Sequence, residues 1–321
     1  MPSSAVLRRV EHDGERPATL IRQAGDHQLL VEFEGEGADL RQNFAVHALI
    51  QLLEQEPIPG LREAVPGVRT VLVIFDPSVL ERDDLLEDLV RLDSIATSLN
   101  SLVLPSRRFE LPIAFDDELT REAVNRYRIT TRMDAPNVLE RSNTDYIVQY
   151  NGFRDREEFF GTFTQPEWWC ASIGFFPGLP SLFSLDPRTQ ISVPKYNPAR
   201  MWTPEGAVGM GGPAIVLYPM ESPGSYQLFG RTLPITQPAS PDSTVEDSHV
   251  FRVGDRVRFR RVTENELLKL RLQVLDGTYV WKIEEDDYAV SDYLEDLDRY
   301  ADSIDRIAQH RAQAATGVEI P

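Results

Sequence analysis

The stretch "KYNPARMWTPEGAVGMGG", which runs from Lys195 to Gly212, contains the densest group of chemically capable side chains in this sequence. A lysine, a tyrosine, an asparagine and an arginine fall within six positions, and glycines follow them. Lysine and arginine can hold a planar anion such as a carboxylate or bicarbonate, because arginine binds it through two parallel hydrogen bonds and lysine attracts it as a point charge. From the residues alone, the more frequent case of two surface charges on an ordinary loop stays open.

Other polar residues near this stretch could take part in the same chemistry. Glu205 and Glu221 are the nearest carboxylates, and either could orient an amine or act as a base, although solvated or capping carboxylates are more common. Arg231 is a second candidate for holding an anion. Tyr226 and Gln227 could line a pocket with hydrogen-bonding groups, or they could simply alternate along a strand.

Two segments rich in glycine, proline and aromatic residues flank the cluster: "GFFPGLP" at 174–180 and "YPMESPGSYQLFGRT" at 218–232. Such a composition indicates tight corners between strands, or a backbone that approaches a ligand closely. The sequence contains no phosphate-binding G-x-x-x-x-G-K motif, and His249 stands too isolated to suggest a Ser-His-Asp triad.

The composition narrows the classes of partner. The formal net charge is −18, from 33 basic and 51 acidic residues. This charge argues against binding to nucleic acid or to an anionic membrane surface, because both need a basic surface. The sequence has no run of 18 apolar residues and no leader with a charged and then an apolar part, so we expect neither a membrane span nor a secretory signal. We therefore expect a soluble, cytoplasmic protein.

The cysteine and the histidines give little reason to expect redox or metal chemistry. Cys170 is the one cysteine and lies in the apolar run "EWWCASIGFF", which predicts a buried, unreactive thiol. The five histidines share no spacing typical of metal ligands, so we expect no metal site.

The first hundred residues read as a small α/β domain over residues 17–104, preceded by a loose lead-in. Apolar periodicity predicts a strand on each side of a turn at 24–26, a helix over 38–55, a strand over 68–76 and a helix over 82–99. Two Pro-Gly turns, at 59–60 and 66–67, are expected only to break the chain between the first helix and the strand that follows.

The rest of the chain, residues 105–321, reads as a second domain of mainly β structure. We expect a strand around Phe109–Phe115 and helices around 118–128 and 144–152. From Trp168 onward, short apolar runs between prolines and glycines are typical of a β-barrel or β-sandwich. Residues 238–248 are expected to form an exposed loop. A closing helix over about 285–315, capped by Ser291, completes the prediction.

Several motifs resemble one known family. "GFFPGLPSL", "TPEGAVGMGG", "YPMESPGSYQLFGRT" and "GDRVRFRRVT" are similar to the family that unites the kinase inhibitor KipI, allophanate hydrolase subunit 1 (the B-type subunit of 5-oxoprolinase) and one half of the carboxyltransferase domain of urea carboxylase. "KYNPARMWTPEGAVG", "LPSRRFELPIAFDD" and the terminal "YAVSDYLEDLDRYADSIDRIAQHRAQAA" resemble the urea carboxylase branch most. The resemblance covers 19–315 and implies an α+β chain, in which a small α/β domain precedes a cyclophilin-like β-barrel with a C-terminal helix.

The resemblance also implies a reaction and a set of site residues. It implies a stand-alone carboxyltransferase subunit that moves a carboxyl group from carboxybiotin to urea or to another amide-like acceptor. Such a subunit would need biotin on a separate carrier protein, a biotin carboxylase that uses ATP, and a sister subunit of the allophanate hydrolase subunit 2 type. The residues implied as catalytic, in the expected position at the mouth of the barrel, are Lys195, Tyr196, Asn197 and Arg200. Those implied as substrate-binding are Glu205, Gly211, Gly212, Glu221, Tyr226, Gln227 and Arg231.

Two departures from the urea carboxylase pattern leave alternatives open. Phe176-Pro177 stands where urea carboxylases carry Gly-Asp, which admits an acceptor other than urea. No methionine is followed by lysine, so the sequence holds no biotinylation motif, and we expect the carrier to lie elsewhere. The first alternative is a subunit of an ATP-dependent amidohydrolase of the 5-oxoprolinase or allophanate hydrolase type. The second is a KipI-like regulator of a kinase without catalytic activity. The resemblance also associates ATP binding and the hydrolase and ligase activities with the family as a whole.

Overall fold

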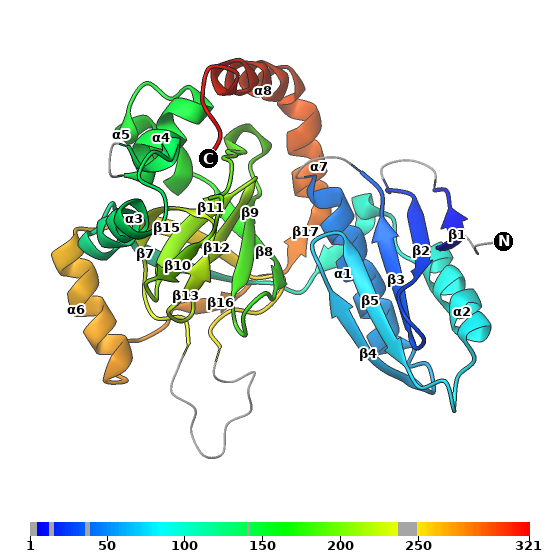
Figure 1. Cartoon of the computed structure of the whole chain (residues 1–321). Helices are drawn as coiled ribbons and strands as arrows, with labels where there is room; N and C mark the ends of the chain where they lie inside the picture. Colours follow the sequence, from blue (N-terminus) through cyan, green and yellow to red (C-terminus); the bar gives the residue numbers. More distant parts are fainter. Residues whose placement is uncertain (1–4, 13–15, 36–38, 140–141, 237–248) are drawn as a thin grey trace. The chain divides into compact units, whose positions relative to one another are not determined.

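The computed structural model describes residues 5–12, 16–35, 39–139, 142–236 and 249–321, and the predicted loop at 238–248 lies outside them. These residues form two compact units (Figure 1). The N-terminal unit comprises the chain up to Pro105 together with Asp287–Glu295, and the barrel unit comprises Ser106–Asp286 together with Asp296–Pro321.

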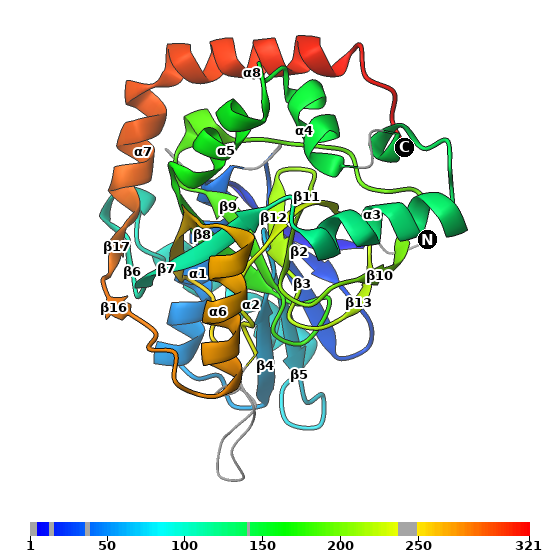
Figure 2. The same ribbon diagram turned by 90° about the vertical axis from the view of Figure 1, so that its left-hand side faces the viewer.

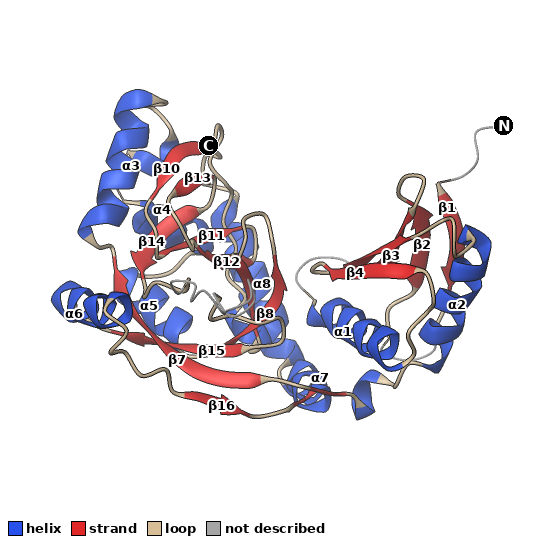
Figure 3. Cartoon of the chain, turned by 90° about the horizontal axis from the view of Figure 1, so that it is seen from below, coloured by secondary structure: helices blue, strands red, loops and turns tan. Residues whose placement is uncertain are grey.

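The N-terminal unit is built on an antiparallel sheet with the strand order β1-β2-β3-β5-β4. Two helices cover one face of this sheet (Figure 3), and the alternating apolar residues of β3 and β5 form the core beneath them. A short pair, β6 with β17, completes the unit. The elements are β1 (Val6–Val10), β2 (Thr19–Gln23), β3 (Gln28–Phe33), α1 (Leu40–Gln55), β4 (Leu61–Pro66), β5 (Thr70–Phe75), α2 (Arg82–Ile95), η1 (Leu99–Ser101), β6 (Val103–Leu104) and β17 (Tyr288–Ala289).

Two strands of this unit correct the sequence prediction. β1 lies in the segment that was expected to be a loose lead-in, and β4 lies between the two Pro-Gly turns, where only a chain break was expected. Both are edge strands, and none of their residues is fully buried. Because an edge strand can form without a buried apolar face, its sequence does not carry the alternation by which β3 and β5 are recognised.

The barrel unit contains a closed ring of seven strands in the order β14-β11-β12-β9-β8-β15-β7, closed by pairing of β7 with β14 (Figure 3). β7 and β15 are parallel, the other pairs in the ring are antiparallel, and β16 adds to β7. The predicted β-barrel is therefore confirmed. The strands are β7 (Arg107–Phe115), β8 (Glu167–Ile173), β9 (Pro180–Ser184), β11 (Ala207–Gly211), β12 (Ala214–Leu217), β14 (Gln227–Arg231), β15 (Arg256–Arg261) and β16 (Ile283–Glu285).

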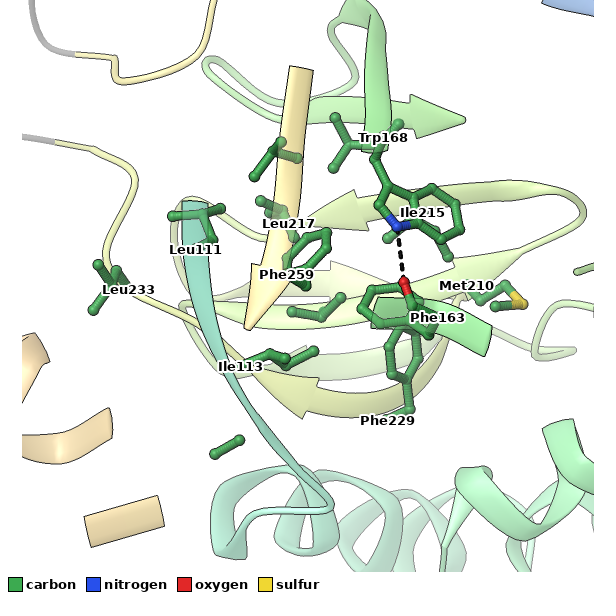
Figure 4. Packing of buried hydrophobic residues seen from close by; sticks show 14 of the residues in the cluster. Leu111, Ile113, Phe163, Trp168, Met210, Ile215, Leu217, Phe229, Leu233 and Phe259 are labelled. Carbon is green, nitrogen blue, oxygen red and sulfur yellow. Dashed lines mark hydrogen bonds between the residues drawn. The ribbon is translucent and has the colours of Figure 1, made fainter. Parts of the chain in front are cut away.

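Large side chains from all seven strands fill the interior of the barrel (Figure 4). Phe163 reaches this cluster from α5 (Arg156–Thr164), and its carbonyl accepts a hydrogen bond of 3.0 Å from the indole nitrogen of Trp168. Cys170 is fully buried in the same cluster, which confirms the prediction of a buried thiol. A filled interior leaves no room for a ligand, so a binding site has to lie on another surface of the barrel.

The helices of the barrel unit differ from the prediction in three ways. α3 (Glu118–Thr130) and α4 (Asn143–Asn151) were expected, whereas α5 and α6 (Glu264–Leu275) were not. The expected single closing helix is two helices, α7 (Val290–Arg299), part of which belongs to the N-terminal unit, and α8 (Ala301–Ala315). Ser291 lies inside α7 and does not cap it. The break at Tyr300 contains neither proline nor glycine, so no residue type in the sequence predicts it. In the described part of the chain, no helix combines the length and apolar character that crossing a membrane requires.

Candidate functional site

The segment from Lys195 to Arg200 is held on the outside of the barrel by a second, two-stranded sheet. β10 (Arg200–Thr203) pairs with β13 (Ser222–Gly224), so that Arg200 lies opposite Gly224. The backbone N–H of Tyr196 donates to the carbonyl of Ser225 at 2.6 Å. These contacts bring two motifs of the sequence, around 195–200 and around 222–227, next to each other.

Arg200 is the most deeply buried charged residue of this segment, with 1% of its surface exposed. Its Nη1 donates to the carbonyl of Tyr226 at 2.5 Å and its Nη2 donates to the hydroxyl of Thr203 at 3.2 Å, while its guanidinium carbon lies 4.4 Å from the centre of the Tyr196 ring. Its Nε is buried without a hydrogen-bond partner among the described residues. Arg200 therefore holds the Tyr226 backbone and the Tyr196 ring in place from behind.

Tyr196 is part of this buried support. Its hydroxyl donates to Oδ1 of Asn143 at 2.8 Å, and its ring meets Tyr127 edge to face with the centroids 4.7 Å apart. Burial raises the pKa of Tyr196, an effect that the nearby Arg200 charge partly offsets. A protonated, buried phenol that already donates to Asn143 positions its neighbours and does not meet solvent.

A cavity of about 190 Å³ lies beside Tyr226, and Lys195 contributes to its wall. The exposed Lys195 places its ammonium nitrogen 5.0 Å from the centre of the Tyr226 ring. We call this space the Lys195 cavity. It is lined by Phe175, Leu179, Ser181, Lys195, Val216, Tyr218, Ser225 and Tyr226.

The Lys195 cavity lies on the outer face of the barrel. Ile215 and Leu217 of β12 belong to the cluster inside the barrel, whereas Val216 and Tyr218 belong to a separate cluster. Because successive side chains of a strand point to opposite faces, Val216 and the cavity that it lines are on the outside. The expected position at the mouth of the barrel is thus corrected, since the closed interior is filled.

Two glycines of β11 allow the tyrosine rings to lie directly on the barrel backbone. A Cβ atom at Gly211 would come within 2.5 Å of Cδ1 of Tyr226, and one at Gly209 would come within 3.0 Å of Cβ of Tyr226. Gly211 therefore provides room for a side chain of the same chain, whereas the prediction assigned its space to a ligand. Gly212 has a positive φ of 58° and open space around its Cα, and its N–H donates to the carbonyl of Val193 at 2.8 Å.

Glu205 and Arg231 form a second charged cluster with Arg271 and Asp117. Glu205 pairs with Arg271 through its carboxylate, and its carbonyl accepts from Nε of Arg231 at 3.2 Å. Nη1 of Arg231 lies 3.8 Å from Oδ1 of Asp117. Burial is the main cause that lowers the pKa of Arg231, and the positive charge of Arg271 lowers it further. Burial raises the pKa of Asp117. None of these residues lines the Lys195 cavity.

Three other predicted residues also lie away from the Lys195 cavity. Gln227 is fully buried, and its amide accepts from Asn137 at 3.0 Å and donates to the Pro194 carbonyl at 2.7 Å. Asn197 is exposed, and its carbonyl accepts from Arg132 at 3.1 Å. Glu221 is exposed beside β13. Of the predicted residues, the structure brings Lys195 and Tyr226 to the cavity, with Tyr196, Arg200 and Gly211 behind them.

Four cavity residues that carry polar or aromatic groups were not among those predicted. Tyr218 and Ser225 lie in the motif at 218–232, and Phe175 lies in the motif at 174–180, so the motifs were correct but the individual residues were not chosen. Ser181 lies in the longer stretch "GFFPGLPSL", but it was not chosen because a single serine in a strand is common. Burial raises the pKa of both Tyr218 and Tyr226, so both phenols stay protonated at neutral pH; for Tyr218, the Arg200 charge and the Tyr226 backbone partly offset this shift.

Metal ligands do not gather at this site. Within the ranges that the structure describes, no three His, Cys, Asp or Glu side chains come together as a metal ion would require. Burial raises the pKa of the Cys170 thiol well above its ordinary value, which makes the thiolate inaccessible as a ligand or nucleophile.

Comparison with known proteins gives one consistent set of relatives. Residues 19–245 match the family described as the carboxyltransferase domain, subdomains C and D. The chain is 33% identical over 301 residues to the urea amidolyase of Saccharomyces cerevisiae, covering 93% of this chain and 16% of that protein. It is 27% identical over 247 residues to the B-type subunit of 5-oxoprolinase from Bacillus subtilis, covering 77% of this chain and 94% of that protein.

The same relationship is present in three dimensions. The crystal structure of the Kluyveromyces lactis urea carboxylase matches with a TM-score of 0.85 and 30% identity, over 98% of this chain and 29% of that chain. The present chain thus corresponds to a small part of each fungal protein and to nearly the whole bacterial subunit.

Proposed function

Because the chain belongs to the family of carboxyltransferase domains, subdomains C and D, we propose that it transfers a carboxyl group from carboxylated biotin to urea or a similar amide, together with the complementary part of the carboxyltransferase. The observation that carries the proposal is the Lys195 cavity, in which a cation and protonated phenols meet on the outer face of the barrel. The fungal relatives named urea amidolyase and urea carboxylase favour urea as the acceptor.

The size of the cavity suits a small planar group. Its volume of about 190 Å³ lies below the ~300–1,000 Å³ typical for drug-sized ligands and far above the ~10–15 Å³ that one water needs. Urea, or the ureido ring of biotin, is of this size class, whereas the whole carrier arm would extend into solvent. Carboxylated biotin, when bound, supplies the carboxyl group, and biotin carboxylase with ATP would charge it on a separate carrier protein.

The residues of this chain divide into those that touch the ligand and those that position them. The Lys195 ammonium would attract the carboxylate and stabilise negative charge that develops on a departing ureido oxygen. Tyr226 and the serine hydroxyls would donate hydrogen bonds to the neutral acceptor, and the buried Tyr218 ring would form part of the wall. Arg200 and Tyr196 are positioning residues in this scheme, because they hold the backbone and the ring of their neighbours from within the protein.

The "GFFPGLP" loop determines which acceptor the cavity would take. Phe176 packs in the apolar cluster with Leu179, Val216 and Tyr218, so the position where urea carboxylases carry Gly-Asp offers no carboxylate here. Phe175 lines the cavity and is 84% exposed. A wall without a carboxylate would suit an uncharged amide and would disfavour a guanidinium, because no anion compensates the charge of the cation.

Reconstitution tests the proposal. The chain is mixed with a biotin carboxylase, a biotinylated carrier and the complementary carboxyltransferase part, supplied with ATP and bicarbonate, and assayed for ATP turnover that depends on urea. Lys195→Ala should lower this turnover by at least tenfold. Lys269→Ala, which removes an exposed lysine from α6, is the matched control and should leave turnover unchanged. Equal turnover in wild type and Lys195→Ala, or the absence of acceptor-dependent turnover in both, would contradict the proposal.

A subunit of a 5-oxoprolinase-type hydrolase is the second candidate. The match to the Bacillus subtilis 5-oxoprolinase subunit covers 94% of that protein, which means that a chain of this extent occurs as a subunit among the relatives. Replacing urea by 5-oxoproline in an assay with a matching partner subunit distinguishes the two candidates, because ATP turnover should follow the correct acceptor.

A further inference from the structure

A second cavity lies beneath α8 in the barrel unit, away from the Lys195 cavity. Figure 1 and Figure 2 show α8 lying alongside α4, and a space of about 290 Å³ remains between α8 and the segment after β9. We call it the Arg311 cavity. Its lining residues are Tyr150, Asn151, Pro187, Gln190, Ser192, Ile304, Ile307, Ala308, Arg311, Ala312 and Ala315.

The cavity arises from how α8 is fixed. At Gly152, which ends α4 with a φ of 67°, a Cβ atom would come within 2.8 Å of both His310 and Ala314, so the helix is in close contact at this point. The α8 residues that face the neighbouring space include Ala308, Ala312 and Ala315, whose methyl groups are too short to fill it. The helix position is therefore set by close contact at one point, and the space beside it stays open.

Arg311 is the charged residue of this cavity. One N–H of its guanidinium donates to the carbonyl of Gln190, and its guanidinium carbon lies 5.5 Å from the centre of the Phe153 ring. No carboxylate of the described residues pairs with it, and none of the residues that line the cavity is acidic. Burial lowers the pKa of Arg311 to about 10, so the guanidinium remains charged at neutral pH.

Arg311 shares the lack of a carboxylate partner with Arg200, but the Arg200 guanidinium is enclosed by the Tyr226 carbonyl, the Thr203 hydroxyl and the Tyr196 ring, whereas Arg311 borders an open space. Arg107, Arg256 and Arg271 of this unit, whose side chains are 11%, 8% and 10% exposed, each pair with an aspartate or a glutamate, whereas the partly buried Arg311 does not. A protein with a net charge of −18 has acidic residues available for such a pair. Since a charge removed from water is costly unless it is compensated, a site for an external anion explains the arrangement.

We propose that the Arg311 cavity binds a small monocarboxylate with a short apolar body. The guanidinium would receive the carboxylate through charge-assisted hydrogen bonds, and Ile304, Ile307 and the alanines of α8 would cover the apolar part. The volume of about 290 Å³ lies at the lower end of the range for ligand pockets, ~300–1,000 Å³, and so limits the ligand to a few carbon atoms or one ring.

Calorimetric titration of the whole chain with benzoate and with butyrate, at constant ionic strength, tests the proposal. Both carboxylates should bind with a saturable isotherm, and the neutral benzamide should bind at least tenfold more weakly, because it lacks the charge that Arg311 recognises. Arg311→Gln should weaken benzoate binding at least tenfold. Arg306→Gln is the matched control, because Arg306 is exposed on the same helix and bonds only to the Asp302 carbonyl among the described contacts.

A second variant keeps the test decisive if Arg311→Gln loosens α8. Ala308→Trp leaves Arg311 in place and fills the cavity from an exposed helix position, so it should abolish benzoate binding while the circular dichroism and unfolding midpoint stay those of wild type. Absence of binding to wild type, equal affinity for benzamide, or unchanged affinity in Ala308→Trp would overturn the proposal. The readout is binding alone, so its outcome is independent of the carboxyl transfer proposed above.

Discussion

The substitution Gly211→Ala probes the contact on which the Lys195 cavity depends. The new methyl group would lie 2.5 Å from Cδ1 and 2.6 Å from Cε1 of Tyr226, whereas carbon atoms in contact prefer ~3.5–4.0 Å. The ring would have to move by about 1 Å. Overpacking of this kind costs ~1–3 kcal/mol, from which the ~0.5–1 kcal/mol that alanine gains over glycine in a strand is subtracted. We expect a net loss of up to about 2.5 kcal/mol, with a central value of ~1 kcal/mol.

Tryptophan fluorescence during urea unfolding measures the loss of stability of the barrel unit. All four tryptophans, at 168, 169, 202 and 281, belong to the barrel unit. Gly174→Ala is the matched control, because a Cβ atom there meets nothing within 4 Å, and its stability should stay within ~0.5 kcal/mol of wild type. In the proposed reconstituted assay, a ring displaced by about 1 Å should also lower turnover by up to ~100-fold.

A double-mutant cycle with Tyr226→Ala shows whether the ring is the cause. Once the ring is absent, Gly211→Ala should cost nothing or even stabilise the barrel slightly, so the two substitutions should be coupled by more than ~0.5 kcal/mol. The same cost of Gly211→Ala in both backgrounds would refute the reasoning, because the clash would then involve another group.

Three further predictions concern buried groups. Burial lowers the pKa of His47 to about 4 from an ordinary 6.5, so His47 binds a proton at a higher pH in the unfolded chain than in the folded one. The free energy of unfolding should therefore fall by about 3 kcal/mol as the pH drops from above 6.5 to 4. Hydrogen exchange of the α1 amides should show this fall in the wild type and not in His47→Gln. Arg200→Met should destabilise the barrel unit by ~1–3 kcal/mol in urea unfolding, because the Tyr226 carbonyl loses its charged donor, whereas Arg154→Met at an exposed position should change stability by less than ~0.5 kcal/mol. Iodoacetamide should label Cys170 only as fast as the barrel unfolds, and rapid labelling of native protein would contradict its burial.

The sequence predicted those elements whose apolar pattern faces a core. β5 and β7 carry long apolar stretches that are buried in their units, and both were expected within two residues of their bounds. α6 was missed because its apolar residues surround the helix: Leu267 is buried, while Leu268, Leu272 and Leu275 are 47%, 63% and 64% exposed. Such a pattern has no single apolar face for periodicity to detect.

The candidate site was predictable as a set of motifs but not as a geometry. Lys195 and Arg200 are five positions apart in one segment, yet one is exposed at the cavity and the other is 1% exposed behind it. That division depends on the pairing of β10 with β13 and on the contact of Lys195 with the Tyr226 ring, which join two separate segments of the chain, and on the packing of Arg200 on the nearby Tyr196 ring. Residue type and spacing carry no information on such contacts, so the role of each cation could not be assigned from the sequence.

The order of the two units along the chain has a consequence for how the protein is made. Tyr288 and Tyr293 pack on Phe44 of α1 with ring centroids 5.9 Å and 5.5 Å apart, and β17 pairs with β6, although Ser106–Asp286 of the barrel unit lies between them in the sequence. At ~5–20 residues per second, a ribosome would need roughly 10–40 s to supply these partners after the first 105 residues. During this time the N-terminal unit therefore exposes an apolar face. A chain released from the ribosome before residue 287 would lack part of the core of its N-terminal unit.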